Sequence, residues 1–196
     1  MSKVQELEKL HKKWFKKCQC ALKETATRPV PGYGNPEAQI VFIGEAPGKQ
    51  EDIQGRPFIG AAGKFLDEML GTIKMKREYI YITNIVKYRP PNNRDPLPKE
   101  KEDCIDWLYD ELNLIKPKLI IFLGRHSMSN FFPDQKISEA HGKLLIKKFK
   151  NIKTENFLPL YHPAAALYNG GMRKTLIADF KKIPKILEKI KNKNPQ

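Results

Sequence analysis

The sequence predicts an α/β fold, a three-layer αβα sandwich whose central sheet is mainly parallel and has four strands. Short runs rich in apolar residues have the length of buried strands, and helical segments separate them. Alternating strands and helices favour parallel pairing, because a parallel connection must cross back over the sheet. The expected strands are 40–43, 79–86, 119–123 and 157–161. At 196 residues the chain suits a single domain, which we expect to span 1–196.

The spacing of apolar residues predicts the helices that cover this sheet. Residues 3 to about 24 place Val4, Leu7, Leu10 and Trp14 on one helical face, with lysines on the other faces. Further helices are expected from about Ala61, from Pro98, from His126 to Phe132, and from about Met172 with a kink at Pro184. The proline-rich segment 87–96 is expected to be a loop, and the segment 137–153 is expected to be irregular or hairpin-like.

Polar loops follow the expected strands. The carboxyl ends of parallel strands lie along one edge of a sheet, so the loops that leave them are brought together. Here these loops are 45–48, 84–95, 124–126 and 162–171. The first of them leads into an acidic, glycine-rich segment that carries Phe58. Convergent polar loops at such an edge are typical of an active site.

The charge balance favours a polyanionic partner. Lysine and arginine outnumber aspartate and glutamate by 36 to 22, which gives a net charge of +14. Nucleic acid is the simplest partner for such a surplus, because its phosphates bind basic surfaces regardless of base sequence. A lysine-rich surface that only keeps the protein soluble is the alternative, and charge alone leaves both interpretations open.

The composition indicates neither a membrane protein nor a secreted one. The longest apolar runs, such as 119–123, are far shorter than the roughly 20 residues that span a bilayer. No segment pairs a basic face with a strongly aromatic one, and the N-terminal segment lacks the apolar stretch of a secretory signal. Three cysteines, an odd number, argue against a disulfide framework. We therefore expect a cytoplasmic protein.

Five motifs in order resemble the thermophile-type (family 4) uracil-DNA glycosylases. They are GEAPGKQED at 44–52, GRPFIGAAGKFLDEML at 55–70, TNIVKYRPPNNRDP at 83–96, IIFLG at 120–124 and LYHPAAAL at 160–167. Each motif alone is weak, but together they cover the chain from about Cys20 to Phe180. The resemblance implies a monofunctional DNA glycosylase of base excision repair. Such a monomeric enzyme flips uracil out of single- or double-stranded DNA and hydrolyses its N-glycosidic bond.

The resemblance also implies a set of uracil-binding residues. Phe58 matches the aromatic platform on which the base stacks. Asn84 matches the residue that pairs with the uracil edge, and its amide offers one donor and one acceptor side, a pattern that cytosine reverses. His162 matches the residue that contacts a uracil carbonyl oxygen and stabilises the developing oxyanion. Backbone groups of Ala46 and Pro47 are expected to line the base.

Two glutamates match the acidic residues of the first motif. Glu45 is expected to stabilise the cationic sugar and orient water, and Glu51 to wall the pocket near the uracil C5 edge. The assignment of these two roles stays open at this point. Better-known superfamily members have a water-activating aspartate where Ala46 stands here. The remaining histidines, His11, His126 and His141, are interpreted as structural.

The DNA contacts are expected on the same loops. Candidate phosphate-binding residues are Arg89, Asn93, Arg94, Arg125 and Arg173. For each of them a solvated side chain without a partner is the alternative. Leu167, which Tyr168 follows, is the candidate wedge that fills the gap left by the flipped base.

The expected cofactor of this family meets an incomplete set of ligands. Family members typically carry four cysteines for a [4Fe–4S] cluster, and the matching positions here are Lys17, Cys20, Tyr88 and Cys104, with Cys18 nearby. Three thiols cannot make a four-cysteine site. We predict that no cluster or other metal is bound and that Trp14, Tyr88 and Trp107 fill its space. A cluster with incomplete cysteine ligation is the alternative.

Two other functional classes are the alternatives to a glycosylase. A catalytically inactive DNA-binding module of the same fold would have no reason to keep Glu45, Phe58, Asn84 and His162 together. A phosphate-binding enzyme built on the GAAGK segment is disfavoured, because the segment lacks the spacing and the Ser/Thr of a phosphate-binding loop.

Overall fold

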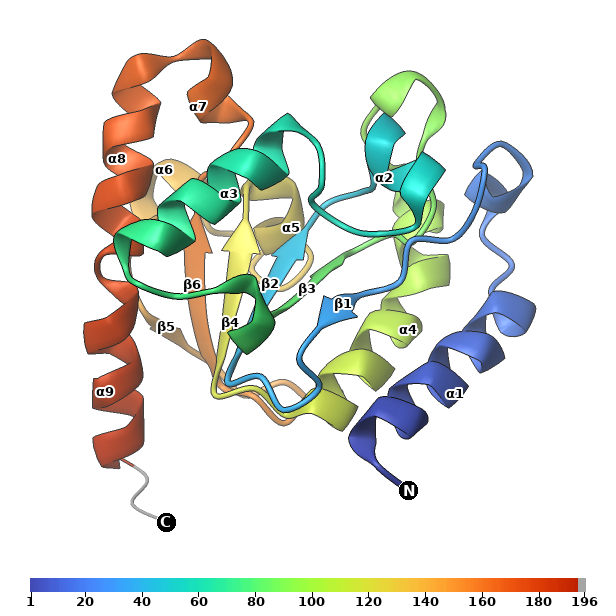
Figure 1. The fold of residues 1–196 in the computed structure, drawn as a ribbon, viewed down its shortest axis with the longest axis horizontal. Coiled ribbons are helices and arrows are strands. Elements are labelled where there is room, and N and C mark those ends of the chain that lie inside the picture. Colours follow the sequence, from blue (N-terminus) through green and yellow to red (C-terminus); the bar gives the residue numbers. More distant parts are fainter. Residues whose placement is uncertain (194–196) are drawn as a thin grey trace.

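The computed structural model describes residues 1–193 and has a six-stranded sheet at its centre (Figure 1). The strand order is β1-β3-β2-β4-β6-β5. The bounds are β1 Tyr33–Gly34, β2 Ile40–Gly44, β3 Tyr81–Asn84, β4 Leu119–Leu123, β5 Leu145–Ile146 and β6 Asn156–Leu160. The pairs β3/β2, β2/β4 and β4/β6 are parallel, which confirms the α/β class and the parallel core of the predicted fold.

The prediction of four strands was wrong at the two edges of the sheet. β1 pairs antiparallel with β3, and β5 pairs antiparallel with β6, so the sheet is mixed. Each of these strands has only two residues. A pair of residues carries no alternation that a sequence pattern can reveal, and edge strands of this kind form where a loop happens to run beside the sheet.

The five expected helical segments are present in order, whereas the short helices α2, α6 and α7 were not predicted, because four to six residues are too few to show a helical period. They are α1 Lys3–Lys17, α2 Lys49–Gln54, α3 Ala61–Thr72, α4 Pro98–Ile115, α5 Arg125–Ser129, α6 Ile137–Ala140, α7 Ala165–Tyr168, α8 Gly170–Phe180 and α9 Ile183–Lys193. Short 3₁₀ turns lie at Ala21–Glu24, Arg77–Tyr79 and Pro91–Asn93.

Three helix boundaries differ from the prediction, and one of them is the end of α5, which lies at Ser129 rather than at Phe132. The first helix ends at Lys17 rather than near residue 24, because Cys18 leaves the helical conformation, and Val4 is exposed. The last helical segment is two helices rather than one kinked helix. Pro184 is the second residue of α9, where its missing N–H removes no helical hydrogen bond.

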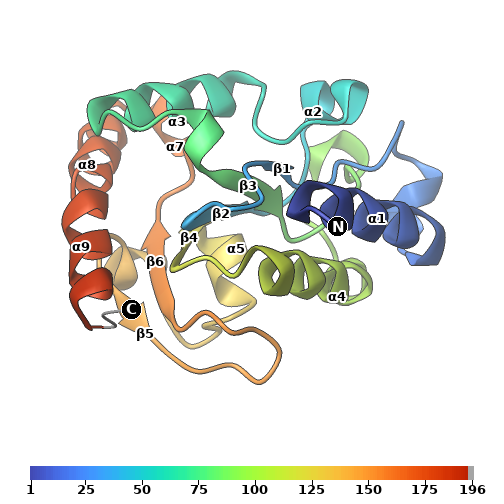
Figure 2. The same cartoon turned by 60° about the horizontal axis from the view of Figure 1, so that its bottom comes forward.

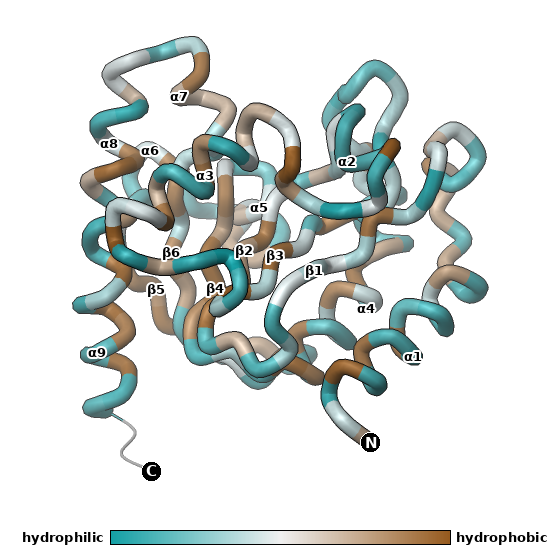
Figure 3. Tube along the Cα trace, viewed as in Figure 1, coloured by the Kyte–Doolittle hydropathy of each residue, from teal (hydrophilic) through white to brown (hydrophobic). Residues whose placement is uncertain are grey.

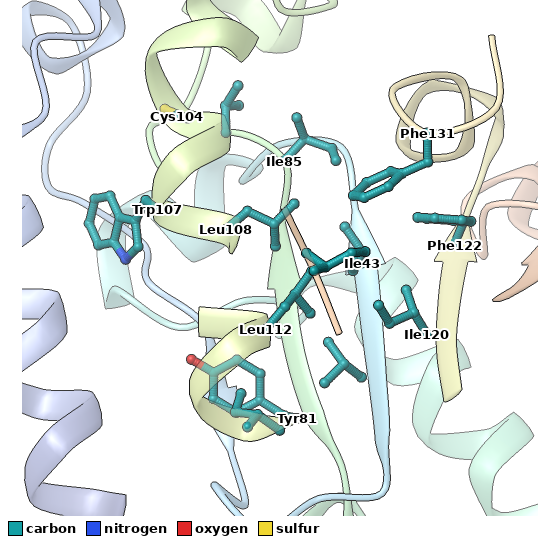
Figure 4. Packing of buried hydrophobic residues seen from close by; sticks show 14 of the residues in the cluster. Ile43, Tyr81, Ile85, Cys104, Trp107, Leu108, Leu112, Ile120, Phe122 and Phe131 are labelled. Atoms are coloured by element: carbon teal, nitrogen blue, oxygen red, sulfur yellow. The ribbon is translucent and has the colours of Figure 1, made fainter. Parts of the chain in front are cut away.

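The strands bury opposite faces against two groups of helices. Along β2, Val41 and Ile43 join the cluster packed by α1, α4 and α5, whereas Ile40 and Phe42 join the cluster packed by α3, α8 and α9. Figures 1 and 2 show α1 and α4 far from α8 and α9 across the sheet. Figure 4 shows residues of the first cluster, with Trp107 and Leu108 of α4 on the side of Ile43. These contacts confirm the three-layer arrangement.

Hydropathy follows the layers. Figure 3 shows hydrophobic colour concentrated in the strands and a mixture of both colours along the outer helices. Such a mixture is expected where one helical face packs on a sheet and the other meets water. Among the helices of residues 1–193, none combines the length and the apolar character that crossing a bilayer requires.

A buried ion pair joins the sheet to α4. Lys87 and Glu111 have no exposed side-chain surface, and Lys87 Nζ lies 2.7 Å from Glu111 Oε2. The Glu111 carboxylate also accepts hydrogen bonds from Thr83 Oγ1 at 2.8 Å and from the Gly32 backbone N–H at 3.0 Å, and His11 Nε2 lies 3.1 Å from it. This one carboxylate therefore ties together α1, α4, β3 and the segment before β1.

The partners of Glu111 keep it ionised. Burial by itself raises the pKa of a carboxyl group, but the charge of Lys87 and the contact with His11 outweigh it and lower the pKa of Glu111 to about 2. Because this pKa lies below that of the unfolded chain, the ionised carboxylate stabilises the fold above about pH 4. This stabilisation is lost as the pH falls from about 4 towards 2.

We predict that Glu111→Leu destabilises the protein by about 3–5 kcal/mol, because Lys87 is left as an unpaired buried charge. Urea unfolding followed by circular dichroism measures the change. The control is Glu37→Gln, which removes the exposed Lys3–Glu37 pair and should change stability by less than about 1 kcal/mol. Equal losses of unfolding free energy in the two variants would contradict the conclusion that the buried pair matters more for stability than the exposed pair.

Candidate active site

A pocket of about 340 Å³ opens at the carboxyl ends of β2 and β3. It is lined by Glu45, Ala46, Pro47, Gly48, Glu51, Phe58, Ala62, Asn84, Pro90, Asn93, Arg94, His162 and Ala164. Every residue that the sequence analysis assigned to uracil binding or catalysis is among them. Loops separated by more than a hundred residues meet here, because parallel strands end at the same edge.

The close approach of two side chains requires glycine at the end of β2. A Cβ atom on Gly44 would lie 2.3 Å from Asn84 Oδ1 and 2.6 Å from the Phe58 ring. Real Cβ atoms do not approach other atoms so closely, so no other residue fits without moving both neighbours. Gly44 therefore sets the distance between the amide and the aromatic ring.

The loop that carries Phe58 is held by a partly buried acceptor, the Glu51 carboxylate. Glu51 Oε1 accepts the backbone N–H groups of Ile59 at 3.0 Å and Gly60 at 2.8 Å. Arg77 donates to the Phe58 carbonyl from the other side. Phe58 itself has a φ of 53°, a left-handed conformation that is strained for this residue and needs such support. In this structure the Glu51 carboxylate shapes the aromatic wall of the pocket.

Asn84 presents an unused acceptor. Its side chain is 1% exposed, and its Oδ1 atom is buried without a hydrogen-bond partner. An unpaired buried amide oxygen carries a free-energy penalty of about 1–3 kcal/mol unless a ligand supplies the missing donor. The backbone carbonyl of Asn84 accepts from Lys87 Nζ at 2.9 Å, so the buried ion pair also fixes this residue.

His162 is held as one neutral tautomer. The backbone N–H of Ala164 donates to His162 Nδ1 at 3.1 Å, so the ring proton lies on Nε2. Burial, and then the neighbouring His126, lower the pKa of His162 to about 4. The ring lies 5.7 Å from the Phe58 ring, centroid to centroid. At neutral pH this imidazole is an uncharged donor beside an aromatic surface.

Glu45 is a carboxyl group poised between its two protonation states. Burial, and then repulsion from Asp95, raise its pKa to about 7, although Lys101 and Arg125 act in the opposite direction. Within residues 1–193, ligand atoms of Glu45, Asp95 and His126 lie within 4.8 Å of one another. That spacing alone would suit a cation, but Arg125 Nε donates to His126 Nε2 at 3.0 Å and adds a positive charge there.

The candidate DNA-binding residues differ in how free their charge is. Arg94 makes two hydrogen bonds to the Glu100 carboxylate, at 2.8 and 2.6 Å, and Arg173 pairs with Glu68. By contrast, Arg89 donates to Asn93 Oδ1 at 2.8 Å, and Arg125 donates to a neutral imidazole. The hydrogen-bond partners of Arg89 and Arg125 are thus uncharged groups, so these bonds leave both positive charges unneutralised.

The tip of α7 carries two exposed apolar side chains. Leu167, the predicted wedge, is 41% exposed, and Tyr168 is 91% exposed. From the sequence, Tyr168 is identified only as the residue that follows the wedge. A ring exposed to this degree is free to stack on a base, and an aromatic residue directly beside the wedge is the available sequence signal.

The three cysteines lie in one buried region beside α4, where Cys18 and Cys20 donate to the backbone carbonyls of Asp103 and Glu100. Cys18, Cys20 and Cys104 are buried, and hydrogen-bonding contact with Cys104 lowers the pKa of Cys18 to about 6. Burial and these three thiols raise the pKa of Tyr88, whose hydroxyl is buried without a hydrogen-bond partner. Three thiols and one phenol do not fit the four-cysteine ligand set of a [4Fe–4S] cluster, because the Tyr88 ring stands where a thiolate is needed.

Aromatic packing lies beside these thiols. The Trp14 and Trp107 rings stack with centroids 6.1 Å apart, and Trp107 is fully buried. Figure 4 shows Cys104 and Trp107 along the same helix, α4. Trp14, Tyr88 and Trp107 belong to the same buried cluster as the three cysteines, and their replacement of a metal cluster stays a prediction.

The fold and the pocket define a class of protein. The fold is a three-layer α/β sandwich, and a small pocket at the carboxyl edge of its sheet is lined by an aromatic ring, a buried amide and a neutral imidazole. These are the groups that a base-binding hydrolase needs. A family model described as the uracil DNA glycosylase superfamily matches residues 31–190. The chain therefore belongs to the uracil-DNA glycosylase superfamily.

Curated relatives of the type-4 class match most of the chain. A type-4 uracil-DNA glycosylase of Archaeoglobus fulgidus is 47% identical over 177 residues, which cover 87% of each chain. Another, of Sulfurisphaera tokodaii, is 45% identical and covers 92% of this chain and 84% of its own. A third, of Thermotoga maritima, is 36% identical and covers 94% of this chain and 97% of its own. These matches support the family resemblance read from the motifs.

We predict that Gly44→Ala blocks the pocket, because the added methyl group would displace the Asn84 amide and the Phe58 ring. The expected destabilisation is about 1–3 kcal/mol. Affinity for free uracil, measured by calorimetry, should fall more than tenfold. The matched control is Gly71→Ala in α3, which meets nothing within 4 Å and should be neutral or slightly stabilising. Unchanged uracil binding in Gly44→Ala would contradict the pocket assignment.

Proposed function

We propose that this protein is a uracil-DNA glycosylase that removes uracil from DNA by hydrolysing its N-glycosidic bond and leaves an abasic site. The observation that carries the proposal is the unpaired Asn84 Oδ1 at the floor of a pocket with an aromatic wall. Type-4 uracil-DNA glycosylases at 45–47% identity over most of the chain support it. Removal of uracil is the first step of base excision repair.

In the proposed complex the flipped base stacks on Phe58 and pairs with Asn84. Uracil presents an N3–H donor beside the O4 acceptor, so Asn84 Oδ1 accepts from N3–H while Nδ2 donates to O4. Cytosine presents an acceptor at N3 and a donor at C4, which would leave the buried amide facing like groups. A site built around a hydrogen bond rejects such an analogue strongly, by about 10⁴-fold or more.

The leaving uracil carries negative charge as the glycosidic bond breaks. His162 Nε2–H is the proposed donor to the uracil O2 oxygen, because Nδ1 is already occupied by the Ala164 N–H. A neutral donor in a water-poor site supplies electrostatic stabilisation of several kcal/mol to the developing anion. Since the pKa of His162 is about 4, this role holds throughout the neutral range.

The two glutamates take different roles in this mechanism. Glu51 holds the Phe58 loop through two backbone hydrogen bonds, which assigns it to shaping the wall beside uracil. Glu45 Oε1 is buried without a hydrogen-bond partner, and it lines the same pocket. We assign Glu45 to the stabilisation of the sugar cation and the orientation of the attacking water. Backbone groups of Ala46 and Pro47 line the base.

The DNA is proposed to bind across the loops around the pocket mouth. Arg89 and Arg125 contact phosphates, with Asn93 positioning Arg89, and Arg94 and Arg173 can contribute after exchange of their carboxylate partners. Leu167 enters the gap left by the base, and the net charge of +14 gives the general affinity for the backbone. We further propose that the enzyme acts as a monomer in the cytoplasm.

We also propose that the enzyme needs no iron–sulfur cluster or metal. The chain has three cysteines in all, and the Tyr88 phenol replaces the missing thiol. The Cys18 and Cys20 thiols donate to the α4 backbone carbonyls of Asp103 and Glu100, and Trp14 of α1 stacks on Trp107 of α4, so side-chain packing can hold this region together.

We predict excision of uracil in EDTA from DNA with one U opposite G, detected as strand cleavage after alkali treatment. DNA with thymine or cytosine at that position should stay intact. Asn84→Ala should lower the single-turnover rate by about 10²–10³-fold, because the hydrogen-bonded recognition of the base is lost. If the protein binds this DNA but leaves it intact, the proposed glycosylase activity is contradicted, and an inactive DNA-binding module remains.

We predict that the anaerobically purified protein is colourless and contains no stoichiometric iron. Visible absorption and iron analysis measure this. The matched control is the double variant Lys17→Cys/Tyr88→Cys, which completes the four-cysteine pattern of the family and should become brown under the same conditions. A brown wild-type protein with a broad visible absorption band would overturn the proposal.

A further inference from the structure

His126 lies between two carboxylates at the edge of the pocket. Its Nδ1 atom is 3.5 Å from Glu45 Oε1, and its Nε2 atom is 3.4 Å from Asp95 Oδ2. The histidine belongs to the first turn of α5, directly after β4, so the rigid edge of the sheet places it. Glu45 Oε1 is the atom that is buried without a hydrogen-bond partner. The sequence analysis had interpreted His126 as structural.

The tautomer of His126 follows from its other neighbour. Arg125 Nε can only donate, and it lies 3.0 Å from His126 Nε2, which must therefore accept. The neutral ring then carries its proton on Nδ1, the nitrogen that faces Glu45. Burial lowers the pKa of His126, and Arg125 and Lys101 lower it further against the effect of Asp95, so the neutral form prevails at pH 7.

We propose that His126 is a positioning residue for catalysis, whose Nδ1–H donates to Glu45 Oε1 and holds that carboxylate ionised and correctly oriented towards the attacking water. The distance of 3.5 Å shortens to a hydrogen bond when DNA closes the pocket, as is usual for catalytic contacts that are long in the free enzyme. The proposal rests on the assignment of Glu45 as the group that orients water.

The surrounding charges explain why Glu45 needs this donor. Asp95 repels the Glu45 carboxylate, whereas Lys101 of α4 and Arg125 of α5 attract it. The pocket also contains Glu51, Arg94 and His162. Burial and Asp95 together leave Glu45 with a pKa of about 7, so a large fraction would be protonated at neutral pH. A hydrogen bond to the ionised form favours that form.

The test is the pH dependence of the single-turnover excision rate on single-stranded uracil DNA from pH 5.5 to 9. If ionised Glu45 is the active form, the wild-type rate rises with pH through a midpoint below about 7, because the His126 donor favours the ionised carboxylate. His126→Phe removes the donor, so the midpoint should shift upward by about one pH unit, towards 7. The rate should then fall about fivefold at pH 6 and change less than twofold at pH 9.

Two variants separate the hydrogen bond from the bulk of the side chain. His126→Asn keeps an N–H near the position of Nδ1 and should restore a profile close to that of the wild type. Asp95→Asn removes the repelling charge and should shift the profile downward instead. A structural loss of His126 would lower the rate equally at all pH values and would not be rescued by asparagine, and that outcome would overturn the proposal.

Glu45→Gln distinguishes a failure of this proposal from a failure of its basis. A fully active Glu45→Gln enzyme would show that Glu45 does not orient water, and both assignments would fall. If Glu45→Gln is impaired but His126→Phe leaves rate and pH profile unchanged, only the role of His126 is wrong. If both single variants are impaired as predicted, the double variant Glu45→Gln/His126→Phe should be no slower than Glu45→Gln alone, because the two residues act through one interaction.

Discussion

The buried pair of Lys87 and Glu111 is the interaction on which both the helical layer and the pocket depend. One carboxylate accepts from Thr83, from the Gly32 backbone and from Lys87, and so it joins elements that are distant in the chain. The ammonium group reaches the backbone carbonyl of Asn84 as well. A buried pair of this kind adds little net stability over apolar residues, but losing one member is severe. It therefore specifies one position for the end of β3.

The pocket keeps polar atoms unpaired, and the fold around it sustains that penalty. Asn84 Oδ1 and Glu45 Oε1 are both buried without hydrogen-bond partners. Phe58, in its left-handed conformation, stands beside them. Such features persist only where the surroundings over-determine them, as Gly44, Glu51 and the Lys87 pair do here. In the proposed function the flipped base supplies the missing donor. Binding of the base then removes the free-energy penalty that the unpaired acceptor causes in the free enzyme.

The cysteine region has a different physical character from that of a metal centre. Lys17 stands at one position of the family's cysteine pattern, and its ammonium group lies 4.7 Å from the Trp14 ring centroid. Tyr88 stands at another and packs among the thiols. Under the proposal that no cluster is bound, the apolar area buried by the stacked indole rings takes the place of bonds to a cluster in holding this region together. Two polar atoms in this region, the Tyr88 hydroxyl and Trp107 Nε1, are buried without a hydrogen-bond partner.

The sequence by itself determined the parallel core, the helices that cover it and the meeting of polar loops at one edge of the sheet. Buried strands and helical faces are local patterns, and parallel strands end on one edge, so the convergence of these loops follows from spacing. The choice of Glu45, Phe58, Asn84 and His162 within them came from the resemblance to the family. The roles of these residues stay predictions. Only the tertiary structure decided the two-residue edge strands, the break before α9, the attachment of Glu51 to the Phe58 loop and the approach of His126 to Glu45. Each of these features is a contact between groups that no periodic sequence pattern relates. The distance between such groups is set only when the chain packs into its tertiary structure.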